Sequence, residues 1–304
     1  IKSVIQYGLQ RGVRIVPEFD VPGHSASWGF GYPELVSPCF AAIAQSSQGV
    51  LERGINIQAM DVTQKTLLPF LKDLLDEVKS LFPDNFIHLG GDEVAASCWR
   101  SVPHIAKVMQ EKNIDTAGLQ ALFTESLLNT ALPSQRRAIL WEESFKDKNL
   151  SEFSTSAVVN IWTAEGIQNI LPHALKAGHQ AVLSFGAYLD RQNPVGDASK
   201  PAQGTHWMFM STWTDMYSEM MKGIDGNAIL GGEASSWGEN VDQFNLDERI
   251  FHRLPAVAER LWSPDTVSDV NDARIRMAEL RCKLLRRIAV RAGPVFPDYC
   301  DAEL

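Results

Sequence analysis

The order of helix-like and strand-like segments predicts an α/β fold, and within that class a barrel. Apolar runs with strand character alternate with amphipathic segments along one continuous stretch, which is typical of a parallel sheet with helical crossovers. Each strand-like run ends in polar or aromatic residues, as barrel strands do at the face that carries the chemistry. No GxGxxG fingerprint follows any of them, which argues against a dinucleotide-binding sheet.

Six segments have the composition of buried strands. They are residues 13–20, 85–87, 138–141, 157–162, 181–185 and 228–233. A closed barrel of this type needs eight strands. We therefore expect residues 1–304 to form one catalytic (β/α)8 TIM-barrel domain that is truncated at its N-terminus and lacks the first two strands.

Helical periodicity accounts for the segments between these strands. Helices are expected at about 1–11, 64–81, 116–131 and 166–177, and two C-terminal helices at about 247–262 and 267–292. Glycine- and proline-rich composition predicts one long loop that ends near residue 60 and another at about 188–213.

The segment His88-Leu-Gly-Gly-Asp92-Glu93 follows the second predicted strand and is the most informative part of the chain. Gly90 and Gly91 leave room for another group to approach the backbone. Adjacent carboxylates repel each other and burial disfavours ionisation, so one of the pair could stay protonated near neutral pH and act as a general acid. The alternative is a solvated acidic loop.

Carboxylates and tryptophans also gather at the other predicted strand ends. Aromatic faces stack on sugar rings while carboxylates accept hydrogen bonds from hydroxyls, so this mixture favours a carbohydrate pocket. Each tryptophan could equally belong to the core, and a lone His24 could be structural. A metal site built from His24, His88 and Asp92 is a further alternative. The strand-end residues are Glu18, Asp20, His24, Trp141, Glu142, Trp162, Tyr188, Asp190, Trp237 and Glu239.

Composition restricts the partners and the compartment. The formal net charge of -9 argues against nucleic acid as a partner, and no apolar run reaches the ~18 residues of a membrane span.

The four cysteines form no CxxC motif. Their even number is compatible with two disulfides, and the alternative is four buried thiols in a cytosolic enzyme. A glycosylation sequon at Asn149 favours a secretory route. Because the sequence opens at Ile1 inside a helical pattern, we expect it to derive from a longer precursor.

Short motifs occur from one end of the chain to the other. They are Glu18-Phe-Asp-Val-Pro-Gly-His24, Ser27-Trp-Gly29, His88-Leu-Gly-Gly-Asp-Glu93, Cys98-Trp99, Tyr188-Leu-Asp190, Gly231-Gly-Glu-Ala234, Trp237-Gly-Glu239 and Ala258-Glu-Arg-Leu-Trp-Ser263. In this order they resemble glycoside hydrolase family 20, and within it the lysosomal, eukaryotic type of β-N-acetylhexosaminidase. The resemblance implies removal of terminal non-reducing β-linked N-acetylglucosamine or N-acetylgalactosamine, with no cofactor and no metal. It implies substrate-assisted catalysis, in which the 2-acetamido oxygen of the substrate attacks the anomeric carbon.

The resemblance assigns roles to individual residues. Glu93 is the expected proton donor, Asp92 orients the acetamido N–H, and Tyr188 donates a hydrogen bond to the acetamido oxygen. Tryptophans wall the expected pocket, and three polar residues reach the sugar hydroxyls or the catalytic pair. The walls are Trp141, Trp162 and Trp237, and the polar residues are His24, Asp190 and Glu239.

The family pattern also implies the disulfides Cys39–Cys98 and Cys282–Cys300, a lysosomal or secreted protein, and a homo- or heterodimer. Family members carry a sugar-binding arginine after their first barrel strand and an acidic residue after the second, and this sequence starts beyond both. An inactive or sugar-binding fragment is therefore the alternative function. Asp190 matches the type that binds neutral sugars and Arg191 the type that accepts anionic ones, so the substrate preference stays open.

Overall fold

The computed structural model describes residues 1–39, 58–146, 156–191, 211–221, 224, 226–238, 240–296 and 300. The chain divides into two compact units, the first made of Ile1–Asn160 with Gln168–Ala181 and the second of Ile161–Ile167 with Val182–Leu304. Four expectations fall wholly or partly on residues outside the described ranges: the sequon at Asn149, the site residue Glu239, most of the loop at 188–213, and residues 40–57 of the loop that ends near residue 60.

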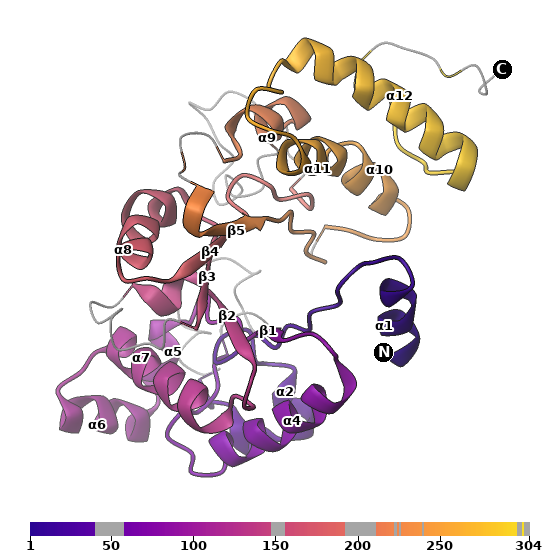
Figure 1. The fold of residues 1–304 in the computed structure, drawn as a ribbon. Coiled ribbons are helices and arrows are strands. Elements are labelled where there is room, and N and C mark those ends of the chain that lie inside the picture. The colour runs from indigo at the N-terminus through magenta and orange to yellow at the C-terminus, as the bar shows by residue number, and fades with distance from the viewer. Residues whose placement is uncertain are drawn as a thin grey trace. The chain divides into compact units, whose positions relative to one another are not determined.

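A five-stranded sheet has the strand order β1-β2-β3-β4-β5, the same as the order along the chain (Figure 1). β1 pairs with β2 and β2 with β3 in parallel, as a succession of βα units requires. Five of the six predicted strands are thus confirmed. They are β1 (Phe86–His88), β2 (Arg137–Trp141), β3 (Val158–Ile161), β4 (Gln180–Leu183) and β5 (Ile229–Gly232).

The prediction of a strand at residues 13–20 is wrong. Here only Glu18 forms a bridge, which is parallel to His88. The carbonyl of Pro17 accepts the N–H of His88, but Pro17 has no N–H with which to continue a ladder. Val13 is 54% exposed, so the apolar residues that suggested a buried strand do not all enter the core. The segment still runs beside β1 and carries Glu18 and Asp20 to the end of that strand.

The predicted helices are present, but several are shorter or divided. Residues 116–131 and 166–177 each contain a helix together with a π-helical turn, and residues 247–262 contain two helices, the second of which has Pro255 in its first turn. Short helices α2, α5, α6 and α9 were not predicted. The helical elements are α1 (Lys2–Leu9), α2 (Trp28–Gly31), η1 (Pro33–Leu35), α4 (Leu67–Leu81), α5 (Ala96–Ser101), α6 (Pro103–Lys112), α7 (Thr116–Ser126), η2 (Leu127–Ala131), η3 (Glu142–Phe145), η4 (Gly166–Ile170), α8 (Leu171–Lys176), α9 (Trp213–Glu219), η6 (Gly226–Ala228), α10 (Leu246–Phe251), α11 (Leu254–Trp262) and α12 (Val270–Ile288).

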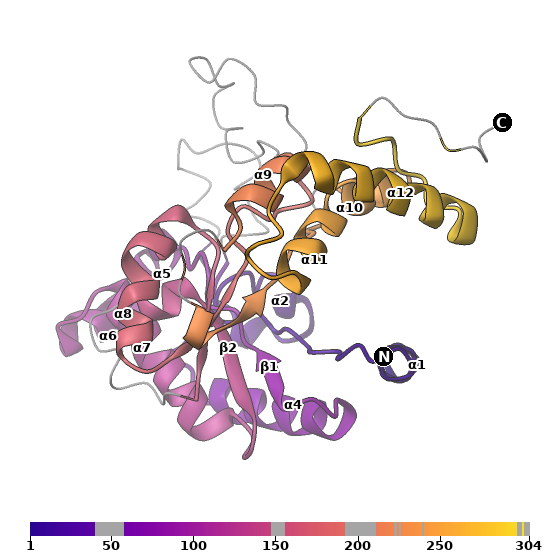
Figure 2. The ribbon, with the colours of Figure 1, turned by 45° about the horizontal axis from the view of Figure 1, so that its top comes forward.

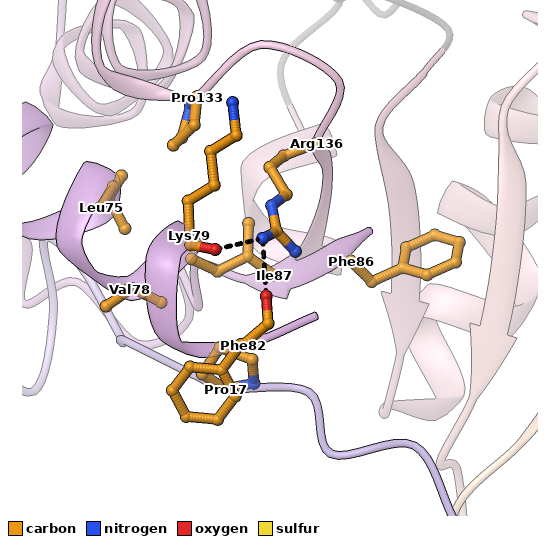
Figure 3. A pocket seen from close by; sticks show the side chains of 9 residues that line it. All are labelled: Pro17, Leu75, Val78, Lys79, Phe82, Phe86, Ile87, Pro133 and Arg136. Carbon is orange, nitrogen blue, oxygen red and sulfur yellow. Dashed lines mark hydrogen bonds between the residues drawn. The ribbon is translucent and has the colours of Figure 1, made fainter. Parts of the chain in front are cut away.

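Each unit has its own packed interior. In the first unit, α4 buries several of its leucines, and Leu75 and Val78 of this helix line a small pocket with Phe86 and Ile87 of β1 (Figure 3). In the second unit, α11 packs against α9, α10 and α12 (Figure 2). Among the described helices, none is both long and apolar enough to cross a membrane.

Both disulfides implied by the family resemblance are present. Cys39 is bonded to Cys98 in the first unit, and Cys282 to Cys300 in the second. Cys98 lies in α5 beside Trp99, whose indole N–H donates to the carbonyl of Met60 at 2.9 Å. The bond therefore anchors α5 to the segment around Cys39.

Arg136 caps the C-terminal end of α4 and closes one side of the pocket in Figure 3. Its Nη2 donates to the carbonyls of Lys79 at 2.8 Å and Phe82 at 2.7 Å, which have no partner further along the helix. We expect Arg136→Met to lower the free energy of unfolding by about 1–3 kcal/mol, because both carbonyls lose a donor. Urea denaturation measures the loss.

The matched control is Arg100→Met, which removes an exposed arginine of α5. It should change the free energy of unfolding by no more than about 0.5 kcal/mol. Equal stability of the two variants would contradict the capping role of Arg136.

Candidate active site

Asp92 and Glu93 follow β1 directly, at its C-terminal end. The parallel ladder with β2 continues past His88, since the N–H of Leu89 donates to Ile139 and the N–H of Trp141 donates to Gly90, each at 2.9 Å. The chain then turns through two glycines with positive φ, 65° at Gly90 and 103° at Gly91. The carboxylate pair thus stands where barrel enzymes place catalytic groups.

Gly90 and Gly91 leave room for polar side chains to approach the turn. The sequence predicted such an approach but not which side chains make it. A Cβ atom on Gly90 would lie 1.9 Å from Asp20 Oδ1, and one on Gly91 would lie 2.3 Å from Ser144 Oγ. The Gly91 N–H donates to Asp20 Oδ1 at 2.9 Å, and Gln120 Nε2 donates to the Gly91 carbonyl at 2.6 Å. Asp20 therefore lies directly against the backbone that carries Asp92.

The loop that carries His24 packs against the same turn. A Cβ atom on Gly23 would lie 2.5 Å from the Asp92 carbonyl oxygen, so only glycine allows this approach. His24 and Glu93 both have positive φ, 47° and 48°, which costs a non-glycine residue of order 1–3 kcal/mol. Such backbone strain is concentrated at functional sites.

His24 lies between the two carboxylates. Its Nε2 is 3.5 Å from Asp92 Oδ2 and 3.5 Å from Glu93 Oε2. The Asp92 side chain is largely buried, whereas that of Glu93 is 55% exposed. The cluster therefore has one carboxylate held inside and one that faces solvent.

The charges in this cluster follow from its contacts. Interaction with Asp92, and then with Glu93, raises the pKa of His24 to about 11. Burial, and then the charge of Asp92, raises the pKa of Asp20 to about 9. Burial alone would raise the pKa of Asp92, but hydrogen bonds with His24 and Asp20 outweigh it and hold that pKa below its usual value. At neutral pH Asp20 is thus protonated, Asp92 ionised and His24 a cation.

A raised carboxyl pKa, which the adjacent pair led us to expect here, is found at the neighbouring Asp20. Mutual repulsion of Asp92 and Glu93 was the reason to expect one of them to be protonated. In the structure the His24 cation contacts both carboxylates, and the group with the raised pKa is Asp20. Asp92 keeps its negative charge and can accept a hydrogen bond or stabilise a developing positive charge.

His88 and Trp141 form a second layer behind the turn. His88 Nδ1 accepts the N–H of Gly90 at 3.1 Å, and burial lowers the pKa of His88 to about 4. The Trp141 ring packs against the His88 ring at 4.8 Å, and its indole N–H donates to Glu18 Oε1 at 3.1 Å. Trp141 is buried, and its predicted place in a pocket wall stays a prediction.

The alternative of a metal site was based on His24, His88 and Asp92. In the structure Asp20, and not His88, lies with His24 and Asp92. Among the described residues, ligand atoms of Asp20, His24 and Asp92 lie within 4.8 Å of one another. A histidine must be neutral to bind a metal. The carboxylate contacts of His24 raise its pKa, so a metal that bound here would have to displace the proton of His24.

The remaining predicted site residues lie in the second unit. Tyr188 bridges Ser235, and its ring is 6.1 Å from that of Trp162. Asp190 is buried, and Trp237 is partly exposed. The structure thus brings His24, Asp92 and Glu93 together in one unit, and separately Trp162 and Tyr188 in the other.

Two residues at the site were expected there from the sequence, but without an individual role, and two others were missed. Asp20 ends the segment next to β1 and lies four positions before His24. Glu18 stands in the same segment. Gln120 comes from α7 and Ser144 from η3, and no local pattern marks either as a neighbour of Gly91.

Comparison with known proteins identifies the family. A model described as glycosyl hydrolase family 20, catalytic domain, matches residues 1–265. The chain is 35% identical over 309 residues to β-hexosaminidase subunit A1 of Dictyostelium discoideum, covering 100% of this chain and 53% of that protein. It is 34% identical over 305 residues to the human β-hexosaminidase subunit beta, covering 100% of this chain and 51% of that protein.

A solved structure agrees with this result. The Flavobacterium johnsoniae chitobiase superposes with a TM-score of 0.75 at 30% identity, covering 95% of this chain and 42% of the chitobiase. The chain spans about half the length of the curated relatives above. Since the family model matches most of its residues, the chain belongs to glycosyl hydrolase family 20.

Proposed function

We propose that the protein is a β-N-acetylhexosaminidase that removes terminal non-reducing β-linked N-acetylglucosamine or N-acetylgalactosamine from glycans, with retention of configuration. The observation that carries the proposal is the cluster in which His24 contacts both Asp92 and Glu93. Family membership and the names of the relatives support the same activity. The expected substrates are glycans or glycoconjugates that end in N-acetylhexosamine.

Asp92 suits the role of orienting a nucleophile that belongs to the substrate. When the acetamido oxygen attacks the anomeric carbon, positive charge develops on the acetamido group. A buried, ionised carboxylate that accepts the acetamido N–H would stabilise this charge in a site of low dielectric constant. Asp92 is largely buried, and its lowered pKa keeps it ionised.

Glu93 suits the role of the general acid and then of the base that activates water. Its half-exposed side chain can reach a glycosidic oxygen that enters from solvent. His24, 3.5 Å away, offsets the repulsion between the two carboxylates when Glu93 loses its proton. No second enzyme carboxylate is needed, because the substrate supplies the nucleophile.

Residues of the second unit suit sugar recognition. In this proposal Tyr188 donates to the acetamido oxygen, and Trp162 and Trp237 pack against the sugar. Asp190 is buried, and its Oδ1 accepts no hydrogen bond from the described residues, so a sugar hydroxyl would satisfy it. Glu239 is assigned to hydroxyl recognition by the same family pattern.

The test compares two aryl glycosides with the full-length protein. An aryl N-acetyl-β-glucosaminide carries the internal nucleophile, whereas the corresponding aryl β-glucoside has a hydroxyl in its place. We expect kcat/KM to be at least about 10³-fold higher for the first, because an intramolecular nucleophile has a very high effective concentration. Equal rates would reject substrate assistance. Calorimetric binding of N-acetylglucosamine without turnover would support the inactive, sugar-binding alternative.

We also propose a secretory route, to the lysosome or the outside of the cell. The two disulfides support it, because such bonds persist in oxidising compartments. The relatives are named as subunits, which supports assembly into a homo- or heterodimer. Sedimentation of the full-length protein would give its oligomeric state.

A further inference from the structure

Arg253 is a buried cation next to the segment that carries Tyr188 and Asp190. It is 2% exposed and lies immediately before α11, within the second unit. Its Nη1 donates to the carbonyls of Tyr188 at 3.3 Å and Ser211 at 3.4 Å, and its Nη2 donates to the carbonyl of Leu189. One guanidinium thus joins three backbone carbonyls from two stretches of chain.

This arrangement is energetically demanding. Burial, followed by repulsion from Arg249, lowers the pKa of Arg253 to about 10, while attraction by Asp190 opposes the shift. A buried charge destabilises a fold unless hydrogen bonds and opposite charges compensate it. Here the compensation comes from the carbonyls of Tyr188, Leu189 and Ser211 and from the field of Asp190.

The segment held by Arg253 makes backbone hydrogen bonds along one edge, and its carbonyls bind the guanidinium. On one edge, the Leu189 N–H donates to the Ser235 carbonyl at 2.7 Å and the Ser235 N–H donates to Ala187 at 2.9 Å. The carbonyls of Tyr188 and Leu189 face the guanidinium. Leu189 also packs in a cluster with Met216 of α9 and Val257 of α11. Arg253 thus fixes the peptide groups on both sides of the Leu189 Cα.

We propose that Arg253 is a positioning residue that sets the orientation of the Tyr188 hydroxyl without touching the substrate. The inference rests on the proposed function, in which Tyr188 binds the acetamido oxygen. The two nitrogens of the planar guanidinium fork hold successive carbonyls in a fixed geometry, which the compact, freely rotating ammonium of a lysine does not impose. Loss of the fork lets the Tyr188 segment shift, and a misplacement of about 1 Å can cost about 100-fold in rate.

Arg253→Lys in the full-length protein is the first test. It keeps the charge but loses the fork, and we expect kcat for an aryl N-acetyl-β-glucosaminide to fall about 10- to 100-fold. The matched control is Arg260→Lys. Arg260 is a buried arginine within α11, and its guanidinium donates to the Val267 carbonyl and to Asp265. This substitution should lower the melting temperature comparably but leave kcat within about 2-fold.

A double-mutant cycle separates positioning from a general loss of structure. If Arg253 acts through the Tyr188 hydroxyl, Arg253→Lys added to Tyr188→Phe should slow the reaction by no more than about 2-fold beyond Tyr188→Phe alone. Multiplicative effects, or a wild-type kcat for Arg253→Lys, would overturn the inference. Arg253→Gln, which buries no charge, is the second variant if Arg253→Lys does not fold, and the same criteria apply to it. Absence of turnover by the wild type would instead refute the proposed function, and this inference with it.

Discussion

Glu93→Gln is expected to slow hydrolysis of an aryl N-acetyl-β-glucosaminide by about 10²- to 10⁴-fold, the range for loss of a general acid and base. Glutamine has nearly the same shape as glutamate but cannot transfer a proton. The side chain is half exposed, so the substitution should leave the fold intact. Steady-state kinetics of the full-length protein measure the effect, and thermal denaturation checks the fold.

Substrates with different leaving groups provide a second test of the role of Glu93. A strongly acidic phenol needs little protonation as it departs, so the loss in the first, glycosyl-transfer step should be much smaller for a dinitrophenyl than for a phenyl glycoside. Glu125→Gln, at an exposed position of α7, is the matched control and should keep the wild-type rate. If Glu93→Gln slowed both substrates equally, or neither of them, Glu93 could not be the proton donor.

Asp92→Asn is expected to lower kcat by about 10²- to 10³-fold, as removal of one preorganised electrostatic group does. The amide can still accept a hydrogen bond but carries no negative charge to oppose the charge on the acetamido group. The same change removes the largest influence that raises the pKa of His24, so that pKa should fall. NMR titration of the His24 ring follows the second effect without a substrate.

Asp20→Asn provides the comparison. Burial raises the pKa of Asp20 to about 9, so the native side chain is a neutral acid at the pH of an assay. Asparagine is also neutral and can keep the hydrogen bond from the Gly91 N–H. Its effect on kcat should therefore be at least about 10-fold smaller than that of Asp92→Asn, which removes preorganised charge. Equal losses in the two variants would reject the ionised role of Asp92.

The sheet was largely predictable because its strands are short apolar runs with clear ends. Five such runs became β1 to β5. The sixth run, residues 13–20, does not form a strand. Pro17 has no N–H to donate, so the pairing of this segment with β1 is limited to a bridge at Glu18. Apolar composition identifies residues that prefer burial, but it does not show whether backbone partners exist on both sides.

The candidate site was predictable only in part. The carboxylate pair and His24 stand in conspicuous local segments, and the structure brings them together. The contacts of Asp20 with Gly91, and of Arg253 with Tyr188, join residues far apart in the chain. No periodicity encodes such contacts, because they depend on how loops from different elements pack. The raised pKa of Asp20 follows from this packing.

The Cys39–Cys98 bond has a consequence for the carboxylate pair. The stretch that carries Asp92 and Glu93 starts from β1 and ends at Cys98, whose sulfur is bonded to Cys39 and whose neighbour Trp99 is fully buried. This segment is therefore fixed at both ends, by β1 and by the disulfide. Much of the conformational entropy that substrate binding would otherwise have to remove is already lost when the protein folds and oxidises. Thiol reductants should therefore slow turnover, because they release the segment between β1 and Cys98, even though no sulfur takes part in the proposed chemistry.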